Sequence, residues 1–136
     1  MLVVDAGPLV AAADEDDREH ERSVRLLTEA TPPLVVPALV VTEVAYFLAR
    51  RLGAIAERSF ARSFRAGELH IEPVELADWA RIDELLEDYE DLGLGIVDAS
   101  VVATCERLGK TELATLDHRH FGAVRPRHCQ ALALLP

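Results

Sequence analysis

The stretch LVVDAGPLV, residues 2–10, joins an apolar run to an aspartate and then to a proline. Three consecutive apolar residues before Asp5 are typical of a short strand that is buried in a sheet. Proline is tolerated in the first turn of a helix, so Pro8 allows a helix to begin close behind Asp5. The stretch therefore predicts a strand over residues 2–5, ending in a carboxylate and passing directly into a helix.

The rest of the chain repeats this alternation of strands and helices. Residues 112–117, ELATLD, again form an apolar run that ends in an aspartate. Trp79, Ile82 and Leu85 recur at helical spacing and are expected to form the apolar face of an amphipathic helix. Strands that alternate with helices favour an α/β fold in which a mostly parallel central sheet of four or five strands is covered on both faces, giving three layers α/β/α. Strands are predicted at residues 32–36, 69–76, 112–117 and 129–135, and helices at residues 18–30, 37–51, 54–67, 77–93 and 96–109.

The composition suits a single domain over residues 1–136. Half of the 136 residues are apolar, and the chain is too short for two ordinary domains. No apolar run approaches the roughly 20 residues of a membrane span, and the first residues lack the basic region of a signal peptide, so no membrane association is expected. Two cysteines make a weak case for a disulfide and favour a reduced, cytoplasmic protein. The net charge of −10 argues against a protein that coats nucleic acid, but is compatible with an enzyme that meets an anionic substrate through a cation.

Three aspartates lie where a parallel sheet would form a binding site. Asp5 and Asp117 each end an apolar strand, and ligands of open parallel sheets bind beyond the carboxyl ends of the strands. Asp98 lies near the start of an apolar helix, and the flexible LGLG segment precedes it. Each aspartate has an alternative role, since Asp5 or Asp98 would suit a helix N-cap and Asp117 would suit a turn.

Glu43 is a fourth acid, and it is harder to explain. It lies in VVTEVAYFL, residues 40–48, where apolar residues on nearly every side predict a buried helix. A buried carboxylate without a partner is costly, so it must be paired or become neutral. Arg50 or Arg51 would be one partner. A metal ion shared with the three aspartates is the other, and it alone accounts for all four acids.

The residue types of this set indicate the metal. Four carboxylates without His or Cys are hard oxygen donors, which suit Mg²⁺ or Mn²⁺ rather than Zn²⁺. Such a cluster repels itself until a divalent cation binds. Its chemistry is hydrolysis of phosphate esters, because the ion positions a phosphate and activates a water molecule.

Four segments resemble, in order and spacing, the motif blocks of PIN-domain ribonucleases, and most of all the VapC-type toxins of bacterial toxin–antitoxin pairs. They are residues 1–13, MLVVDAGPLVAAA; residues 37–51, PALVVTEVAYFLARR; residues 95–109, GIVDASVVATCERLG; and residues 113–121, LATLDHRHF.

This resemblance implies a metal-dependent endoribonuclease, the toxin of a type II toxin–antitoxin pair, that hydrolyses RNA phosphodiester bonds through a water activated by Mg²⁺ or Mn²⁺. It implies that Asp5, Glu43, Asp98 and Asp117 are the catalytic acids, with Asp5 and Asp98 as principal metal ligands and Glu43 and Asp117 as further candidates. Thr115 matches a small hydroxyl residue near the fourth acid. Ala6 departs from the pattern, since many members carry Ser or Thr there. The implied partners are RNA, a cognate VapB-like antitoxin and a second copy of the chain.

Two other functions remain open from the residues alone. An aspartate-nucleophile phosphatase also ends its first strand in aspartate, but it needs a second aspartate two residues later, where this chain has Gly7. The other is a catalytically inactive receiver-like or binding module; its receiver-like version would call for a well-placed lysine, and Lys110 is the only lysine of the chain.

Arginines are candidates for holding the RNA. Arg58, Arg62 and Arg65 recur at i, i+4 and i+7 and form one stripe along a short helix, which is either an RNA-binding rim or a solvated face. The alternative RNA path follows Arg119, Arg125 and Arg127. His118 or His120 would also reach a substrate phosphate, although a surface turn is the simpler interpretation of DHRHF.

Overall fold

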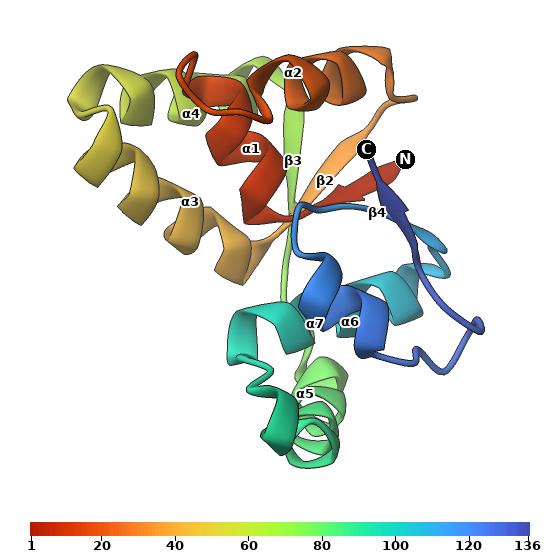
Figure 1. Ribbon diagram of the computed structural model, residues 1–136. Helices are drawn as coiled ribbons and strands as arrows, with labels where there is room; N and C mark the ends of the chain where they lie inside the picture. The colour runs from red at the N-terminus through yellow and green to blue at the C-terminus, as the bar shows by residue number, and fades with distance from the viewer.

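The computed structural model describes residues 1–136 and contains one five-stranded sheet (Figure 1). All four pairs of neighbouring strands are parallel, which confirms the predicted parallel sheet and leaves no antiparallel exception. The strands lie in the order β3-β2-β1-β4-β5. Their bounds are β1 Leu2–Val4, β2 Leu34–Pro37, β3 Leu69–Glu72, β4 Glu112–Ala114 and β5 Ala133–Leu135.

Seven α-helices cover this sheet in two groups, as the predicted three-layer arrangement requires. Figure 1 shows α1 to α4 on one side of the sheet and α5 to α7 on the other. The helices are α1 Ala6–Ala13, α2 His20–Glu29, α3 Ala38–Arg51, α4 Ala54–Ala66, α5 Leu76–Asp88, α6 Ile96–Leu108 and α7 His118–Ala123, with a short 3₁₀ helix at Glu90–Leu92.

The strand order places a topological switch point between β1 and β4. The chain leaves β1 toward β2 on one side of it, and leaves β4 toward β5 on the other side. Because crossovers between parallel strands are right-handed, the two connections lie on opposite faces of the sheet and open a crevice between them. Val4 pairs with Ala114 at the last residues of the two strands, so Asp5 and Thr115 continue the chain side by side into that crevice.

The sheet is buried from both faces, which explains its continuous apolar strands. Val3, Val4 and Val36 are completely buried, as is Leu113 of β4. Helix α6 lies at the centre of the second layer, and its run Ala99–Cys105 is buried without interruption. The elements that carry the predicted acids are therefore anchored in one core of 24 buried residues.

Some element boundaries differ from those that the sequence predicted. Strand β3 ends at Glu72, directly before Pro73, because proline cannot donate a hydrogen bond to a neighbouring strand. The strand predicted over residues 112–117 ends at Ala114, and the predicted turn at DHRHF is the short helix α7. Strand β5 is limited to Ala133–Leu135 instead of residues 129–135.

Two expectations about buried helix faces were wrong. Helix α3 is not buried all round: Val40, Val44 and Leu48 face the core, whereas Tyr46 is 56% exposed. Trp79 was expected to pack on the core with Ile82 and Leu85, but it is 44% exposed on the surface of α5. No helix is both long enough and apolar enough to span a membrane.

Candidate active site

Asp5 and Asp117 are held together by a buried threonine. The hydroxyl of Thr115 donates to Oδ2 of Asp5 at 2.8 Å and accepts the backbone N–H of Asp117 at 3.0 Å. The backbone N–H of Asp5 also donates to the carbonyl of Ala114, at 2.9 Å. Since Thr115 is completely buried, these bonds fix the side chain of Asp5 relative to the loop that follows β4.

Asp98 approaches the same crevice from the other layer. It is the third residue of α6, and the N-cap is Gly95, so the alternative in which Asp98 caps this helix was wrong. Carboxylate oxygens of Asp98 and Asp117 and a ring nitrogen of His120 all lie within 4.8 Å of one another. The backbone of the N-cap residue Gly95 hydrogen-bonds to the Asp98 carboxylate, which also faces Asp117 and His120 in the cluster.

Glu43 completes the group from the second turn of α3. Its charge interacts with those of Asp5 and Asp98, and Asp5 in turn interacts with Asp98 and Asp117. The structure thus brings together the four predicted acids, from β1, α3, α6 and the β4–α7 connection, and it places Thr115 between two of them. This group, Asp5, Glu43, Asp98 and Asp117, is called the acidic cluster below.

His120 belongs to this site, and the sequence analysis gave it only a minor role. Asp117, for which the sequence suggested a turn, is the N-cap of α7: its Oδ1 accepts the backbone N–H of His120 at 2.9 Å. Its Oδ2 lies 2.6 Å from Nδ1 of the same histidine. Aspartate is favoured both at a helix N-cap and in turns, so the sequence alone did not distinguish α7 from a turn or place His120.

Burial and mutual repulsion raise the pKa of three of the four acids. Asp5 is only 6% exposed, and desolvation raises its pKa to about 6, against the opposing hydrogen bond from Thr115. Desolvation also raises the pKa of Glu43, with the charges of Asp5 and Asp98 adding to it. The pKa of Asp98 is raised by desolvation as well. For Asp117 desolvation acts in the same direction, but the hydrogen bonds from His120 outweigh it and lower the pKa.

No lysine or arginine compensates these charges. None forms an ion pair with any member of the acidic cluster. The expected pairing of Glu43 with Arg50 or Arg51 was wrong, because Arg50 donates to the hydroxyl of Tyr46 at 3.0 Å and Arg51 lies over the ring of Phe47. Crowded carboxylate oxygens without a basic partner fit a divalent cation, and the imidazole of His120 is their only nitrogen neighbour in the group.

The arginine stripe of α4 lies away from the acidic cluster. Arg58, Arg62 and Arg65 are exposed, form no ion pair and lie on the face of α4 opposite Ala56 and Phe60. Helix α4 ends just before β3, whose Leu69 pairs with the first residue of β2, so Arg65 lies near the N-terminal edge of the sheet. The acids lie at the C-terminal edge.

Two of the three arginines of the alternative RNA path are engaged within the protein. Arg127 pairs with Glu84, and Arg125 donates to three backbone carbonyls at the end of α7. Arg119 donates only to the carbonyl of Leu92, at 3.5 Å.

Comparison with known proteins agrees with this geometry. Residues 2–125 match the family described as PIN domain. The chain belongs to the PIN domain family. This PIN domain is 30% identical over 125 residues to "Ribonuclease VapC26" of Mycobacterium tuberculosis, a match that covers 92% of this chain and 93% of that relative. The resemblance that the four sequence segments indicated is confirmed.

Solved structures confirm the fold of this PIN domain. It superposes on Mycobacterium tuberculosis VapC20, described as a toxin that cleaves the sarcin–ricin loop, with a TM-score of 0.79 at 22% identity, covering 87% of this chain and 91% of that one. It also superposes on FitAcB of Neisseria gonorrhoeae, with a TM-score of 0.70 at 17% identity, covering 100% of this chain and 97% of that one.

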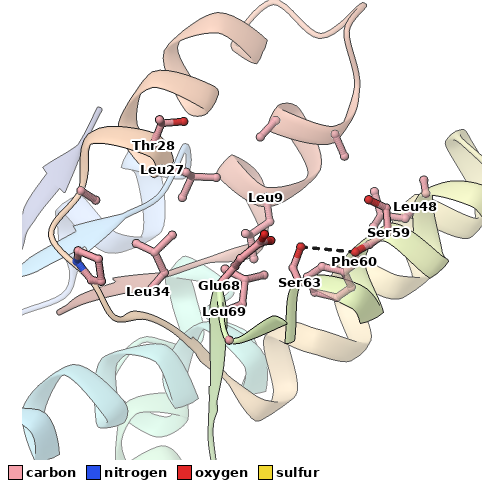
Figure 2. A pocket seen from close by; sticks show the side chains of 16 residues that line it. Leu9, Leu27, Thr28, Leu34, Leu48, Ser59, Phe60, Ser63, Glu68 and Leu69 are labelled. Carbon is pink, nitrogen blue, oxygen red and sulfur yellow. Dashed lines mark hydrogen bonds between the residues drawn. The ribbon is translucent and has the colours of Figure 1, made fainter. Parts of the chain in front are cut away.

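A large apolar groove of this PIN domain lies apart from the acidic cluster. It has a volume of about 690 Å³ and runs between α1, α2 and α4, over the first residues of β2 and β3. Figure 2 shows Leu9, Leu27, Phe60 and Leu69 lining it from these different elements. None of the four acids lines this groove, so its role is distinct from that of the candidate active site.

Proposed function

We propose that this chain, acting as a single domain, is a divalent-metal-dependent endoribonuclease and the toxin of a type II toxin–antitoxin pair. The observation that carries this proposal is the meeting of four acids from four distant segments, with no lysine or arginine paired to any of them. Membership of the PIN family and the relationship to a protein named as a ribonuclease support RNA as the substrate.

The side chains of the site divide the work among them. Asp5 and Asp98 would be the principal ligands of Mg²⁺ or Mn²⁺, with Asp117 and Glu43 as further ligands. When bound, such an ion offsets the repulsion between the acids, attracts a phosphate and makes water more acidic. The hydroxyl of Thr115 holds Asp5 in one orientation. His120 holds Asp117 and favours its ionised form, whereas Glu43, with its raised pKa, is suited to exchange a proton with water.

The structure disfavours an aspartate-nucleophile phosphatase and a receiver-like module. The second aspartate of a phosphatase is absent because position 7 is glycine, and a Cβ there would lie 3.1 Å from Leu116 Cβ, so an aspartate would require Leu116 to shift. Lys110 precedes β4 and therefore lies at the N-terminal edge of the sheet, away from the acids. Neither an aspartate nucleophile with its partner nor a receiver-like lysine is present beside Asp5.

The metal dependence is tested with purified protein and a structured RNA. We expect cleavage in the presence of Mg²⁺ or Mn²⁺, loss of cleavage to the background rate in EDTA, and recovery when the ion is added back in excess. Metal binding should also raise the midpoint of thermal unfolding, because a ligand that binds only the folded state stabilises it.

Two outcomes would contradict this mechanism. Cleavage at the full rate in EDTA would show a metal-free ribonuclease, and the acidic cluster would need another role. Hydrolysis of a phosphomonoester without cleavage of any RNA would favour a phosphatase instead.

We propose two protein partners, each on its own surface. An apolar segment of the antitoxin would occupy the groove between α1, α2 and α4, which is lined by the half-buried Leu27 and Phe60 and by the buried Leu69. A second copy of the chain would cover the exposed apolar residues on the opposite part of the molecule, on α3, β3 and the starts of α5 and α6: Tyr46, Ile71, Leu76, Trp79 and Ile96.

Two variants separate these partners. Trp79→Asp should shift the protein from dimer to monomer in sedimentation velocity. Ser59→Arg places a large cation in the groove from an exposed position, so it should leave the dimer and the ribonuclease activity intact. Neutralisation should then require at least about tenfold more antitoxin, which corresponds to a loss of about 1.4 kcal/mol in binding free energy. Wild-type protein that stays monomeric at high concentration would contradict the dimer, and unchanged neutralisation of Ser59→Arg would contradict the groove.

A further inference from the structure

A second, smaller cavity adjoins the acidic cluster. Its volume is about 170 Å³, and it lies between α1, α3 and the β4–α7 connection. Ala6 and Leu116, which line it, are the direct chain neighbours of Asp5 and Asp117. Gly7 also lines it, and the close approach of Gly7 to Leu116 brings α1 and the connection together. A substrate that runs from the acids across Ala6 and Leu116 would extend over this cavity.

Helix α3 carries a guanidinium to the wall of this cavity. Glu43, Phe47 and Arg51 recur at intervals of four residues, so they lie along one face of α3. The Arg51 guanidinium carbon lies 5.3 Å from the centroid of the Phe47 ring, and both residues line the cavity. Helical side chains lean toward the N-terminus, so the charge of Arg51 is displaced back along α3 toward Glu43. A carboxylate of the cluster, an aromatic ring and a cation thus follow one another on a single surface.

The charge of Arg51 has no partner within the protein. Arg51 forms no ion pair and no side-chain hydrogen bond, and the Phe47 ring restricts its position without neutralising it. Asp17 lies on the same cavity, but its Oδ1 accepts the backbone N–H of Glu19 at 2.8 Å in its own loop. In a chain with a net charge of −10, a free arginine on the same face of α3 as Glu43 is a suitable anchor for an anion.

We propose that Arg51 binds the RNA phosphate next to the scissile one, with the adjoining nucleotide lying over the small cavity. This proposal rests on the proposed ribonuclease function and adds a substrate-binding residue to it. RNA is the ligand rather than an acidic segment of a protein. The acidic cluster would repel a run of carboxylates. The scissile phosphate of RNA, in contrast, is attracted to the cluster by the cation that the acids bind. The remote stripe of Arg58, Arg62 and Arg65 is then proposed to contact only longer RNA.

The test uses a short oligoribonucleotide that contains the cleaved bond, with the full-length protein and Mg²⁺. Because a neighbouring phosphate is bound equally in the ground and transition states, Arg51→Ala should raise KM about tenfold or more and change kcat less than about twofold. The slope of the logarithm of the RNA-binding constant against the logarithm of the salt concentration should become shallower by about 0.7, the value for one phosphate contact with a single strand. Arg51→Lys keeps the charge and should recover most of the salt dependence.

Arg25→Ala is the matched control, because Arg25 is an exposed arginine on the outer surface of α2 and its loss changes the net charge equally. It should leave KM unchanged. Equal KM values for Arg51→Ala and Arg25→Ala would overturn the proposal. So would an unchanged KM for RNA combined with weaker neutralisation of Arg51→Ala by the antitoxin, since Arg51 would then bind the protein partner.

RNA binding is measured with Asp98→Asn, and with Asp98→Asn combined with Arg51→Ala, so that affinity is determined without cleavage. This measurement separates the inference about Arg51 from the proposed ribonuclease function. If RNA is bound but not cleaved by the wild type, the ribonuclease proposal fails, and the Arg51→Ala affinity still decides the anchor. If the wild type neither binds nor cleaves RNA, both proposals are overturned.

Discussion

Asp98→Asn should lower RNA cleavage by about 10³-fold or more, which corresponds to about 4 kcal/mol of transition-state stabilisation, and should abolish growth inhibition in cells. Asp98 is central to the acidic cluster: it lies with Asp117 and His120, and its charge acts on both Asp5 and Glu43. Asparagine has nearly the same shape but lacks the negative charge that a divalent cation requires. Initial rates on a labelled RNA and colony counts after induction measure the two effects.

Asp83→Asn is the control for this variant. Asp83 is an exposed acid on α5 outside the cluster, so the same chemical change should leave the rate within about twofold. Folding of Asp98→Asn is checked by its unfolding midpoint in EDTA, which should not fall, because removing one of several repelling charges relieves the apo protein. A folded Asp98→Asn protein with the wild-type rate would show that the acidic cluster is not the active site.

Asp5→Asn should make the metal-free protein more stable at neutral pH by about 3 kcal/mol, because burial raises the pKa of Asp5 from 3.8 to about 6, a shift of about two units. Below pH 4 Asp5 is protonated in the folded state, and the difference between variant and wild type should be small. As the pH rises from about 4 to about 6, the unfolded chain releases this proton more readily than the folded one, so the wild type loses stability relative to the variant. Asparagine retains an oxygen that can accept the hydrogen bond from Thr115.

Urea unfolding in EDTA between pH 4 and pH 7.5 measures this difference. Asp117→Asn should change the free energy of unfolding in the opposite direction, lowering it at neutral pH, because folding lowers the pKa of Asp117. The ionised Asp117 stabilises the fold above its unfolded pKa, and this contribution is lost as the pH falls through the pKa of the folded state. Saturating Mg²⁺ should reduce the difference in the free energy of unfolding between Asp5→Asn and the wild type. Parallel pH profiles for wild type and Asp5→Asn would refute the account of a repelling, buried Asp5.

The parallel sheet was readable from the sequence because its strands are short, continuous and apolar. A strand buried on both faces needs apolar residues at every position. Val3 and Val4 before Asp5, and Leu113 and Ala114 before Thr115, meet this requirement. The helix α7 was not readable, because six residues offer too little periodicity to distinguish a helix from a turn. The exposure of Trp79 was also hidden, since an apolar stripe shows which residues share a face but not which neighbour covers it.

The site could be predicted in part for the same physical reason. Asp5 and Asp117 follow strands that end at one edge of a parallel sheet, so their meeting depends only on which strands are adjacent. Glu43 was recognised as a candidate site residue because nothing in the surrounding apolar sequence explained a carboxylate at that position. His120 and Arg51 could not be placed, because the bond to Asp117 depends on α7 and the stacking on Phe47 depends on a side-chain orientation that sequence spacing leaves open.

The bond between Thr115 and Asp5 also has a consequence for when the protein can act. Its two residues are 110 positions apart, and the strands that carry them pair directly at the centre of the sheet. Contacts of such long range form late in folding, because the entropy of closing the intervening loop must be overcome first. A chain still emerging from the ribosome lacks β4 and Asp117 until the residues up to position 117 have been made, so a shorter partial chain has Asp5, Glu43 and Asp98 but no crevice in which to assemble them. The same topology that builds the acidic cluster thus delays it until β4 has been made and has paired with β1.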